Sequence, residues 1–327
     1  MANQGVLTQS HPMRFVVSTL LKVTLGISGL VYVFWGLDYA QLNRIVTDFD
    51  MSAVALVTGF SLAVYVFLGY RLRVCSSHGM SVATGTLATL VSHGVNNILP
   101  TKLGEVAKAF YINTRENITK AEALGIVFWE RFLDLNAILI IAAVAVYQID
   151  LELVTLPLCA AVLSLWLVIL AANRWKRLSE NVICLLPFPG IQGFLRELHG
   201  HIGARLSLAF LVKISCLTAM VWVLYGVQAI YILNGAANLG LTLEQAGVVF
   251  VLSSLSMALP TTPGALGVFE AVVVLSLGWY GVQKEVAVLT AVVMHMVEFI
   301  PTCVATLFIL SRTPLRISGW RTAGDAP

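Results

Sequence analysis

Six apolar runs, each long enough to cross a bilayer as one helix, take up most of this sequence. A membrane-spanning helix needs ~20 apolar residues; the runs are Phe15–Leu37, Ser52–Tyr70, Ala121–Ile149, Leu153–Ala172, Leu206–Leu233 and Val286–Leu310. The composition agrees, because 58% of the 327 residues are hydrophobic and 11% are charged, against about 25% charged residues in soluble domains. We therefore predict an integral membrane protein and exclude a water-soluble enzyme.

Two further apolar stretches are interrupted in the middle by Gly, Pro and Asn. They are about Ser81–Ile112 and Leu243–Tyr280. Non-helical backbone at membrane depth is tolerated where it is buried in protein or lines a wet cavity. We predict a re-entrant helical hairpin at each stretch. The fold class is then an all-α polytopic membrane protein, with six full transmembrane helices plus two re-entrant hairpins in a single membrane domain, residues 1–327.

The distribution of Lys and Arg predicts the orientation of the chain. Short loops rich in basic residues stay in the cytoplasm. With the amino terminus inside, 15 of the 20 basic residues fall on the cytoplasmic side, Arg71 and Lys108 among them. The opposite side receives Arg44 and Lys284. We therefore expect both termini to be cytoplasmic.

The order of the elements repeats along the chain. Residues 15–149 and residues 153–310 each contain helix, helix, hairpin (about 81–112 and 243–280) and helix, in that order. Three full crossings would invert the second copy, so the first hairpin would enter from the cytoplasm and the second from outside. Both hairpins contain Leu-Pro-Thr followed by Leu-Gly and an acid, Glu105 or Glu270. We predict an inverted repeat, which is typical of transporters.

Several other classes of site are disfavoured by the sequence. A net charge of +3 without a dense basic stripe argues against nucleic-acid binding. The five cysteines are widely spaced and predict no disulfide framework. His295-x-x-Glu298 resembles half of a metal site that lacks its second half, so we expect neither metal nor cofactor. The basic and aromatic stretch Asn173–Arg205 suits an interfacial helix on anionic headgroups or an ordinary loop.

Charged residues inside the apolar runs mark the candidate site. Each costs about 2.5–3.5 kcal/mol at the bilayer centre and persists where it is paired, hydrated or used. Glu130 and Asp134 lie one turn apart on the same helix face, with Arg131 beside them. One interpretation is a structural ion-pair network in which Glu270 or Glu298 faces Arg131. The other is a network that also takes a proton or a lipid headgroup.

The hairpin turns add a second candidate feature. Each turn begins a half-helix whose first amides and dipole attract an anion such as a phosphate. Glu105 and Glu270 would cap these half-helices or contact a cationic headgroup. The candidate substrate-binding or translocation residues are therefore Asn96, Asn97, Pro100, Gly104, Glu105, Glu130, Arg131, Asp134, Pro260, Pro263, Gly264, Gly267, Glu270, His295 and Glu298.

Three motifs in this order resemble those of a known family. They are Asn96-Asn97-Ile98-Leu99-Pro100 with Leu103-Gly104-Glu105, then Glu130-Arg131 with Asp134, and then the stretch 260–270, which begins Pro-Thr-Thr-Pro-Gly and ends at Glu270. Over nearly the whole chain they resemble the membrane domain of bacterial lysyl-phosphatidylglycerol synthases and its stand-alone, flippase-like relatives. Two positions depart from the family pattern, since Lys108 and His295 stand where an Arg is common.

The resemblance implies a lipid translocase of the bacterial inner membrane, without the aminoacyl-transferase domain and without catalytic residues. Its substrate would be a membrane lipid, such as aminoacylated phosphatidylglycerol or an isoprenoid-derived lipid of the hopanoid or polyprenyl-sugar type. Movement would be downhill or ion-coupled, through titration of Glu130, Asp134 or Glu298. Two alternatives remain: a lipid-modifying enzyme that uses the same acids, and a non-catalytic subunit that partners lipid-synthesis enzymes.

Overall fold

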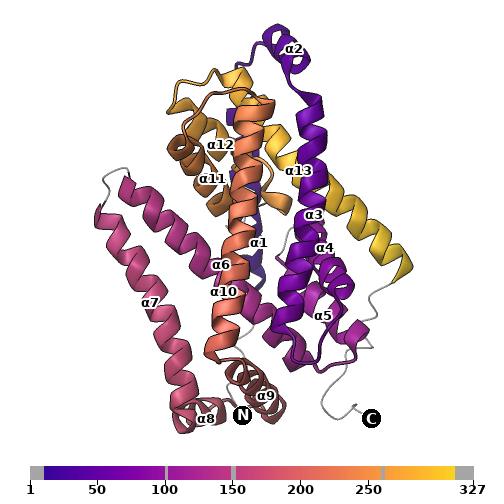
Figure 1. Cartoon of the computed structure of the whole chain (residues 1–327), viewed down its shortest axis with the longest axis vertical. Coiled ribbons are helices and arrows are strands. Elements are labelled where there is room, and N and C mark those ends of the chain that lie inside the picture. The colour runs from indigo at the N-terminus through magenta and orange to yellow at the C-terminus, as the bar shows by residue number, and fades with distance from the viewer. Residues whose placement is uncertain (1–10, 100–101, 149–151, 259–261, 314–327) are drawn as a thin grey trace, which may run out of the picture.

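The computed structural model describes residues 11–99, 102–148, 152–258 and 262–313, and within these ranges the secondary structure is entirely helical. The predicted all-α class is confirmed (Figure 1). The elements are α1 (His11–Phe34), α2 (Tyr39–Asp48), α3 (Met51–Cys75), α4 (Val82–Ile98), α5 (Gly104–Glu116), α6 (Lys120–Gln148), α7 (Glu152–Arg174), α8 (Lys176–Cys184), α9 (Pro189–Ala204), α10 (Leu208–Ile230), η1 (Tyr231–Ala236), α11 (Leu243–Ala258), η2 (Pro263–Ala265), α12 (Val268–Gly278) and α13 (Lys284–Arg312).

Each of the six predicted spans coincides with a helix: α1, α3, α6, α7, α10 and α13. Four segments of the described chain are long and apolar enough to cross a membrane, namely α3, α7, α10 with η1, and α13. A fifth is added if α1 and α2, which meet at 83°, count as one span. The structure therefore supports a membrane protein with four or five candidate spans, and the count of six stays a prediction.

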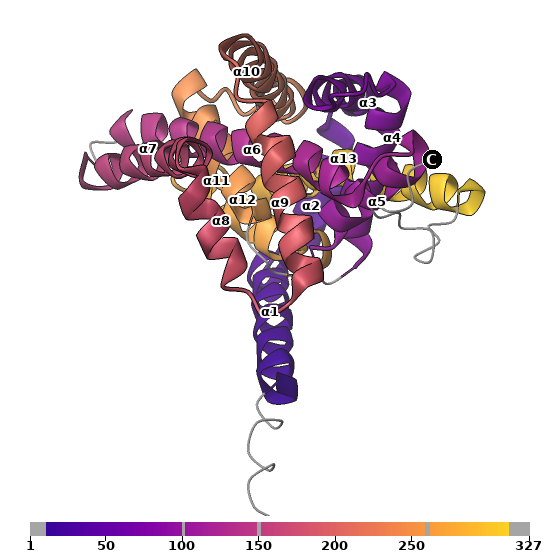
Figure 2. The same ribbon diagram turned by 90° about the horizontal axis from the view of Figure 1, so that it is seen from below.

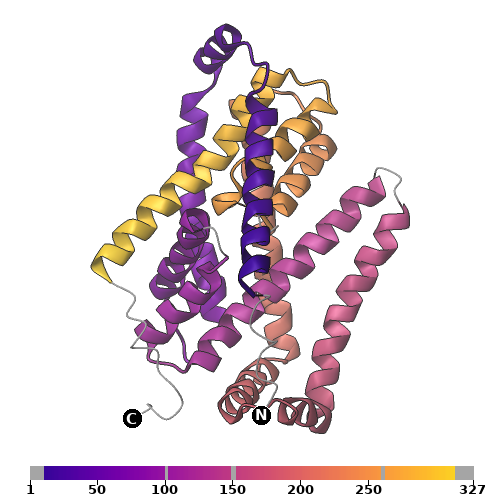
Figure 3. The same ribbon diagram turned by 180° about the vertical axis from the view of Figure 1, so that it is seen from behind.

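Helix α7 shows most directly that this chain requires an apolar solvent. None of its most apolar window is buried inside the protein, and Leu153 and Leu156 are 87% and 74% exposed. Figure 3 shows α7 beside α6, standing away from the rest of the molecule. Contiguous exposed apolar surface of this kind marks contact with a membrane or a partner, and lipid tails would cover it.

Both predicted hairpins appear as pairs of short helices. Helix α4 packs against α5, and α11 packs against α12. The α4–α5 pair lies toward the end of the molecule that carries α8 and α9, and the α11–α12 pair toward the end that carries α2 (Figure 1). This placement agrees with hairpins that approach from opposite sides. The inverted repeat and the re-entrant depth of the hairpins stay predictions.

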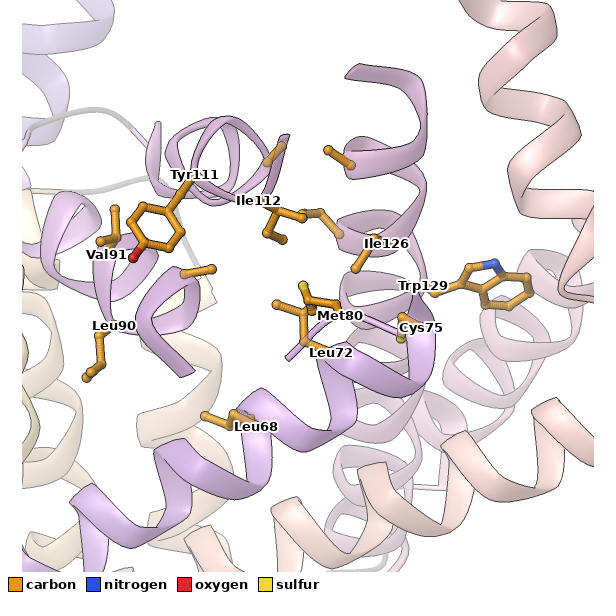
Figure 4. Close-up of a cluster of buried hydrophobic side chains, with 14 of the residues drawn as sticks. Leu68, Leu72, Cys75, Met80, Leu90, Val91, Tyr111, Ile112, Ile126 and Trp129 are labelled. Carbon is orange, nitrogen blue, oxygen red and sulfur yellow. The ribbon is translucent and has the colours of Figure 1, made fainter. Parts of the chain in front are cut away.

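Each hairpin has its own hydrophobic core. Around the first, α3, α4, α5 and α6 bury Leu72, Tyr111, Ile112 and Trp129 to 1% exposure or less (Figure 4). A second core joins α1, α11, α12 and α13 around the other hairpin. The two cores fix each hairpin against long helices, because burying a large apolar side chain stabilises the folded state by about 1.5–3 kcal/mol.

The stretch 173–205, expected as an interfacial helix or a loop, contains two helices. Neither α8 nor α9 has a buried residue, and Figure 2 shows both on the face of the molecule seen from below. Trp175, Leu178, Val182 and Leu185 are exposed, at spacings that place them along one side of α8. The helical alternative is therefore confirmed, while contact with headgroups stays a prediction.

Polar groups terminate several helices at fixed places. Asp50 accepts hydrogen bonds from the amides of Ser52 and Ala53, and the Ser52 hydroxyl is the main cause that holds the pKa of Asp50 below its usual range. Lys284 Nζ donates to the carbonyls of Tyr32 and Trp35 at 3.0 and 2.7 Å. A cation at a helix carboxyl end satisfies free carbonyls there, so Lys284 ties α13 to the end of α1.

The crossing of α3 and α4 depends on glycine. A Cβ atom added at Gly85 would collide with the backbone of Gly69, and one added at Gly69 with the backbone of α4. The two helices therefore meet backbone to backbone, as small residues permit in membrane proteins.

Replacing Gly85 with Ala should force these helices apart. Overpacking costs about 1–3 kcal/mol, so we expect a lower melting temperature for the purified protein in detergent. Gly59→Ala on α3 is the matched control, because a Cβ at Gly59 meets nothing within 4 Å. Equal melting temperatures for the Gly85→Ala and Gly59→Ala variants would contradict the proposed close crossing.

Candidate functional site

Three fully buried charged residues form the floor of a charge cluster between α3, α5 and α6. Arg71, Lys108 and Glu130 have side chains that are 1%, 0% and 0% exposed. Lys108 Nζ lies 2.6 Å from Glu130 Oε2, and Arg71 Nη2 lies 3.1 Å from Glu130 Oε1. Each oxygen of the buried carboxylate therefore has its own cation, as a charge at this depth requires.

Three partly exposed residues form the rim of the same cluster. Arg131 is 41% exposed, Glu105 28% and Asp134 19%. Arg131 Nη2 lies 3.1 Å from Glu130 and 3.3 Å from Asp134, and Arg131 Nε lies 3.5 Å from Glu105. Asp134 also takes both terminal nitrogens of Arg71, at 2.5 and 3.0 Å. Three acids and three bases balance, so the cluster is neutral with one accessible cation, Arg131.

The sequence predicted a span that ends at Tyr70, before Arg71, and the structure corrects this end. The cytoplasmic location of Arg71 and Lys108 stays a prediction. Helix α3 continues past the predicted end at Tyr70 to Cys75, which brings Arg71 inside the protein. The spacing in the sequence could have indicated that Arg71 is buried, because Arg71 follows Leu68 by three residues on the buried face of α3. Lys108 follows Glu105 by three residues, and such neighbours share a helix face.

The expectation that Glu270 or Glu298 faces Arg131 is also wrong. Glu270 Oε1 lies 2.6 Å from His295 Nδ1, both side chains being almost fully buried. Glu298 instead accepts hydrogen bonds from Tyr65 and Gln228. Arg131 pairs with acids on α5 and α6. Glu270 and Glu298, from the second half of the chain, therefore belong to two separate polar sites.

The first hairpin turn is held by its two asparagines. Asn96 Oδ1 accepts a hydrogen bond from the Gly104 amide at 2.8 Å, which ties the end of α4 to the start of α5. Asn97 Nδ2 donates to Thr302 Oγ1 on α13 at 2.9 Å. Pro100, between them and α5, lies outside the described residues.

The second hairpin turn depends on glycine conformations. Gly264 and Gly267 have φ values of 57° and 85°, in the region that L residues rarely adopt. Glu270 Oε2 accepts from the Gly267 amide at 2.7 Å, so its predicted capping role is confirmed. Pro263 starts the short helix η2, and Pro260 lies outside the described residues.

These contacts change the anion-site hypothesis for the half-helices. The amide of Gly104 is already bonded to Asn96, and that of Gly267 to Glu270. An anion would have to displace these side chains to reach the same amides. Arg131, which is half exposed, is therefore the better placed anion ligand of the described residues.

The tips of the two hairpins contact each other. Lys102 Nζ, just after the first turn, donates to the carbonyl of Met257 near the end of α11 at 2.5 Å. A Cβ added at Gly264 would lie 3.3 Å from Asn97 Oδ1. The two hairpin tips therefore lie directly against each other.

Two hollows on the surface lie away from the charge cluster. One, of ≈ 960 Å³, is lined by Arg174, Trp175, Lys176 and neighbours where α7 meets α8. The other, of ≈ 550 Å³, lies along α1 beside Lys284. Both are shallow and mostly apolar, so the chemistry of this protein is better sought at the cluster.

The fold and the site together define a helical membrane domain with an internal, charge-balanced polar site beside broken hairpins. The sequence matches the family described as the lysylphosphatidylglycerol synthase TM region over residues 19–305, and the chain belongs to this family. None of the curated proteins compared with the chain matches it. Family membership links the chain to the modification or translocation of membrane lipids.

Replacing Arg71 with Met should destabilise the protein strongly, because it leaves Glu130 and Asp134 undercompensated. Removing one partner of a buried pair costs about 3–5 kcal/mol. The measurement is thermal unfolding of the purified protein in detergent. Arg73→Met, two residues along α3 and exposed, is the control and should unfold like the wild type. A stable Arg71→Met variant would show that the cluster does not hold α3, α5 and α6 together.

Proposed function

We propose that this protein is a lipid translocase, in which the rim of the charge cluster receives the polar headgroup while the acyl or isoprenoid tails stay in the bilayer. The observation that carries the proposal is Arg131, 41% exposed above a floor of fully buried charges. A guanidinium pairs with a phosphate through two parallel hydrogen bonds. A lipid phosphate would take over contacts that Arg131 now shares with Glu105 and Asp134.

The rim also offers acids for a cationic headgroup. When a phosphate engages Arg131, the Glu105 and Asp134 carboxylates lose part of their partner and become available for an ammonium group. Glu105 would still accept the hydrogen bond from the Ser92 hydroxyl, now 3.2 Å long, and Asp134 would still pair with Arg71. The cluster therefore suits a headgroup that carries a phosphate and an amine, as aminoacylated phosphatidylglycerol does.

The hairpin junction supports movement rather than chemistry. Lys102 with Met257 joins the two tips, and Asn97 with Thr302 joins the first tip to α13. Both contacts can break without unfolding a core. Discontinuous helices at the centre of a membrane domain are typical of secondary transporters. Loosening one tip at a time would open the cluster to one leaflet and then to the other.

The remaining features of the proposal concern location and energy. We place the protein in the bacterial inner membrane, with both termini in the cytoplasm on the basis of the Lys and Arg bias. The sequence contains no glycine-rich phosphate loop before Lys-Ser/Thr, so transport would be downhill or driven by an ion gradient.

Translocation can be measured with headgroup-labelled lipids in proteoliposomes. The probes are phosphatidylglycerol, lysyl-phosphatidylglycerol and a polyprenyl phosphate, with mass spectrometry of the same vesicles. Faster flipping of one class at unchanged mass supports a translocase. A change in lipid mass would favour the alternative of an enzyme, and unchanged flipping of all three would favour a non-transporting subunit of a lipid-synthesis system.

Arg131→Gln should reduce the flipping rate at least tenfold, because it removes the accessible cation while leaving the floor intact. A charged hydrogen bond contributes about 1.5–3 kcal/mol, which corresponds to a factor of ten or more. Arg73→Gln is the control, since Arg73 is exposed outside the cluster, and should flip lipid at the wild-type rate. Wild-type flipping by a folded Arg131→Gln protein would rule out headgroup binding at the rim.

A further inference from the structure

Glu298 differs from Glu270 and from the three acids of the charge cluster in the partners it finds. Glu105, Glu130 and Asp134 face Arg or Lys, and Glu270 faces His295. Among the described residues, Glu298 forms no ion pair with Lys, Arg or His within 4.0 Å. Its carboxylate is held by neutral groups alone, so protonation would break no salt bridge.

Helices α3 and α10 supply these neutral groups. Tyr65 Oη donates to Glu298 Oε2 at 3.0 Å, and Gln228 Nε2 donates to Glu298 Oε1 at 2.7 Å. Gln228 Nε2 also donates to Ser61 Oγ at 2.8 Å. Tyr65 and Gln228 are 3% and 6% exposed, whereas Glu298 is half-buried. Glu298 is therefore more accessible than the two side chains that hold its carboxylate.

The titratable groups on the elements around Glu298 are few. Tyr65 comes from α3, with His93 of α4 against its ring at 5.4 Å, and Tyr225 of α10 lies within electrostatic range. Helix α12 contributes Glu270, which is paired with His295. Helix α2 and η1 also pack against α13. The amide of Asp38, just before α2, donates to Glu285 in the first turn of α13, and η1 carries the exposed Tyr231.

The site also contains a vacant acceptor. Gln228 Oε1 is buried and has no hydrogen-bond partner. An amide presents two donors on one side and an acceptor on the other, and a half-turn exchanges them. A protonated Glu298 carries a new O–H donor, for which the turned amide supplies the missing acceptor. The same three side chains can thus satisfy both protonation states of Glu298.

The segment of α13 that carries Glu298 contacts both hairpin tips. One turn along α13, Thr302 Oγ1 donates to the Glu298 carbonyl at 2.7 Å and accepts from Asn97 of the first tip. The adjacent Phe299 ring lies against Gly264 of the second tip, where an added Cβ would collide with it. A change at Glu298 would therefore act on the segment that touches both tips.

From these observations we propose that Glu298 carries the coupling proton of the translocase. A carboxylate oxygen takes a proton from water on one side of the membrane, forming an O–H bond, and returns it to water on the other side. The proposal rests on the function proposed above. It assigns ion coupling to Glu298 and leaves Glu130 and Asp134 in their ion pairs as structural groups.

The test uses the full chain in vesicles of phosphatidylcholine and phosphatidylglycerol containing labelled phosphatidylglycerol, with the membrane potential clamped at zero. If one proton moves with each lipid, a gradient of one pH unit shifts the leaflet ratio by up to about tenfold. Glu298→Gln should abolish this shift while downhill equilibration continues. Glu285→Gln, on the first turn of the same helix, is the matched control and should respond like the wild type.

A second measurement does not depend on lipid movement. Difference infrared spectroscopy after a pH jump should show a protonated carboxyl band in the wild type that Glu298→Gln removes. Tyr65→Phe retains the carboxyl but removes a donor to its ionised form, so this band should appear at higher pH. If Glu298→Gln fails to fold, the Tyr65→Phe variant tests the proposal instead. A carboxyl band at the same pH as in the wild type would then overturn the assignment to Glu298.

Four outcomes separate the two proposals. Flipping that responds to the gradient through Glu298 supports both. Flipping that ignores the gradient, or responds equally in Glu298→Gln, overturns the proton role and leaves the translocase standing. No flipping with a Glu298 band overturns the translocase but retains proton exchange at this site. No flipping and no such band overturns both.

Discussion

The need to compensate buried charge is the constraint on which the rest of this structure depends. Glu130 is fully buried and meets Lys108 and Arg71, each carried by a different helix. An isolated charge in an apolar interior would cost many kcal/mol, so α3, α5 and α6 are held at the one spacing that brings the three groups together. The first hairpin is locked into the protein by the same contacts, because Lys108 lies on α5.

The hairpins follow from a second constraint, which is that no polar backbone group can be left free in hydrocarbon. Asn96 satisfies the first amide of α5, Glu270 the amide of Gly267 just before α12, and Lys102 a carbonyl near the end of α11. Each is a side-chain contact and not a helix hydrogen bond, so it can be exchanged for a ligand or another partner. Side-chain contacts therefore stabilise the broken ends of these helices.

In the proposed mechanism, headgroup binding and energy coupling use different residues. The rim around Arg131 combines positive and negative groups and suits a phosphate with an amine. Glu298 has neutral partners and suits a proton. Within the segment of α13 from Glu298 to Thr302, Thr302 contacts Asn97 and Phe299 contacts Gly264. In this mechanism, protonation of Glu298 would change the contacts that this segment makes with both hairpin tips.

The all-α membrane class could be predicted from the sequence, together with the positions of the long helices and the breaks at both hairpins. Each depends on a local property of the chain, the length of an apolar run or the placement of Gly and Pro. The sequence also indicated Glu130, Arg131 and Asp134 as neighbours, since all three lie within about one turn of one helix. The partners of the buried charged and polar groups could not be predicted, because they come from distant parts of the chain. Arg71 joins Glu130 across 59 positions and Gln228 joins Glu298 across 70. Pairing over such separations depends on which helix faces pack together, and no local pattern records that.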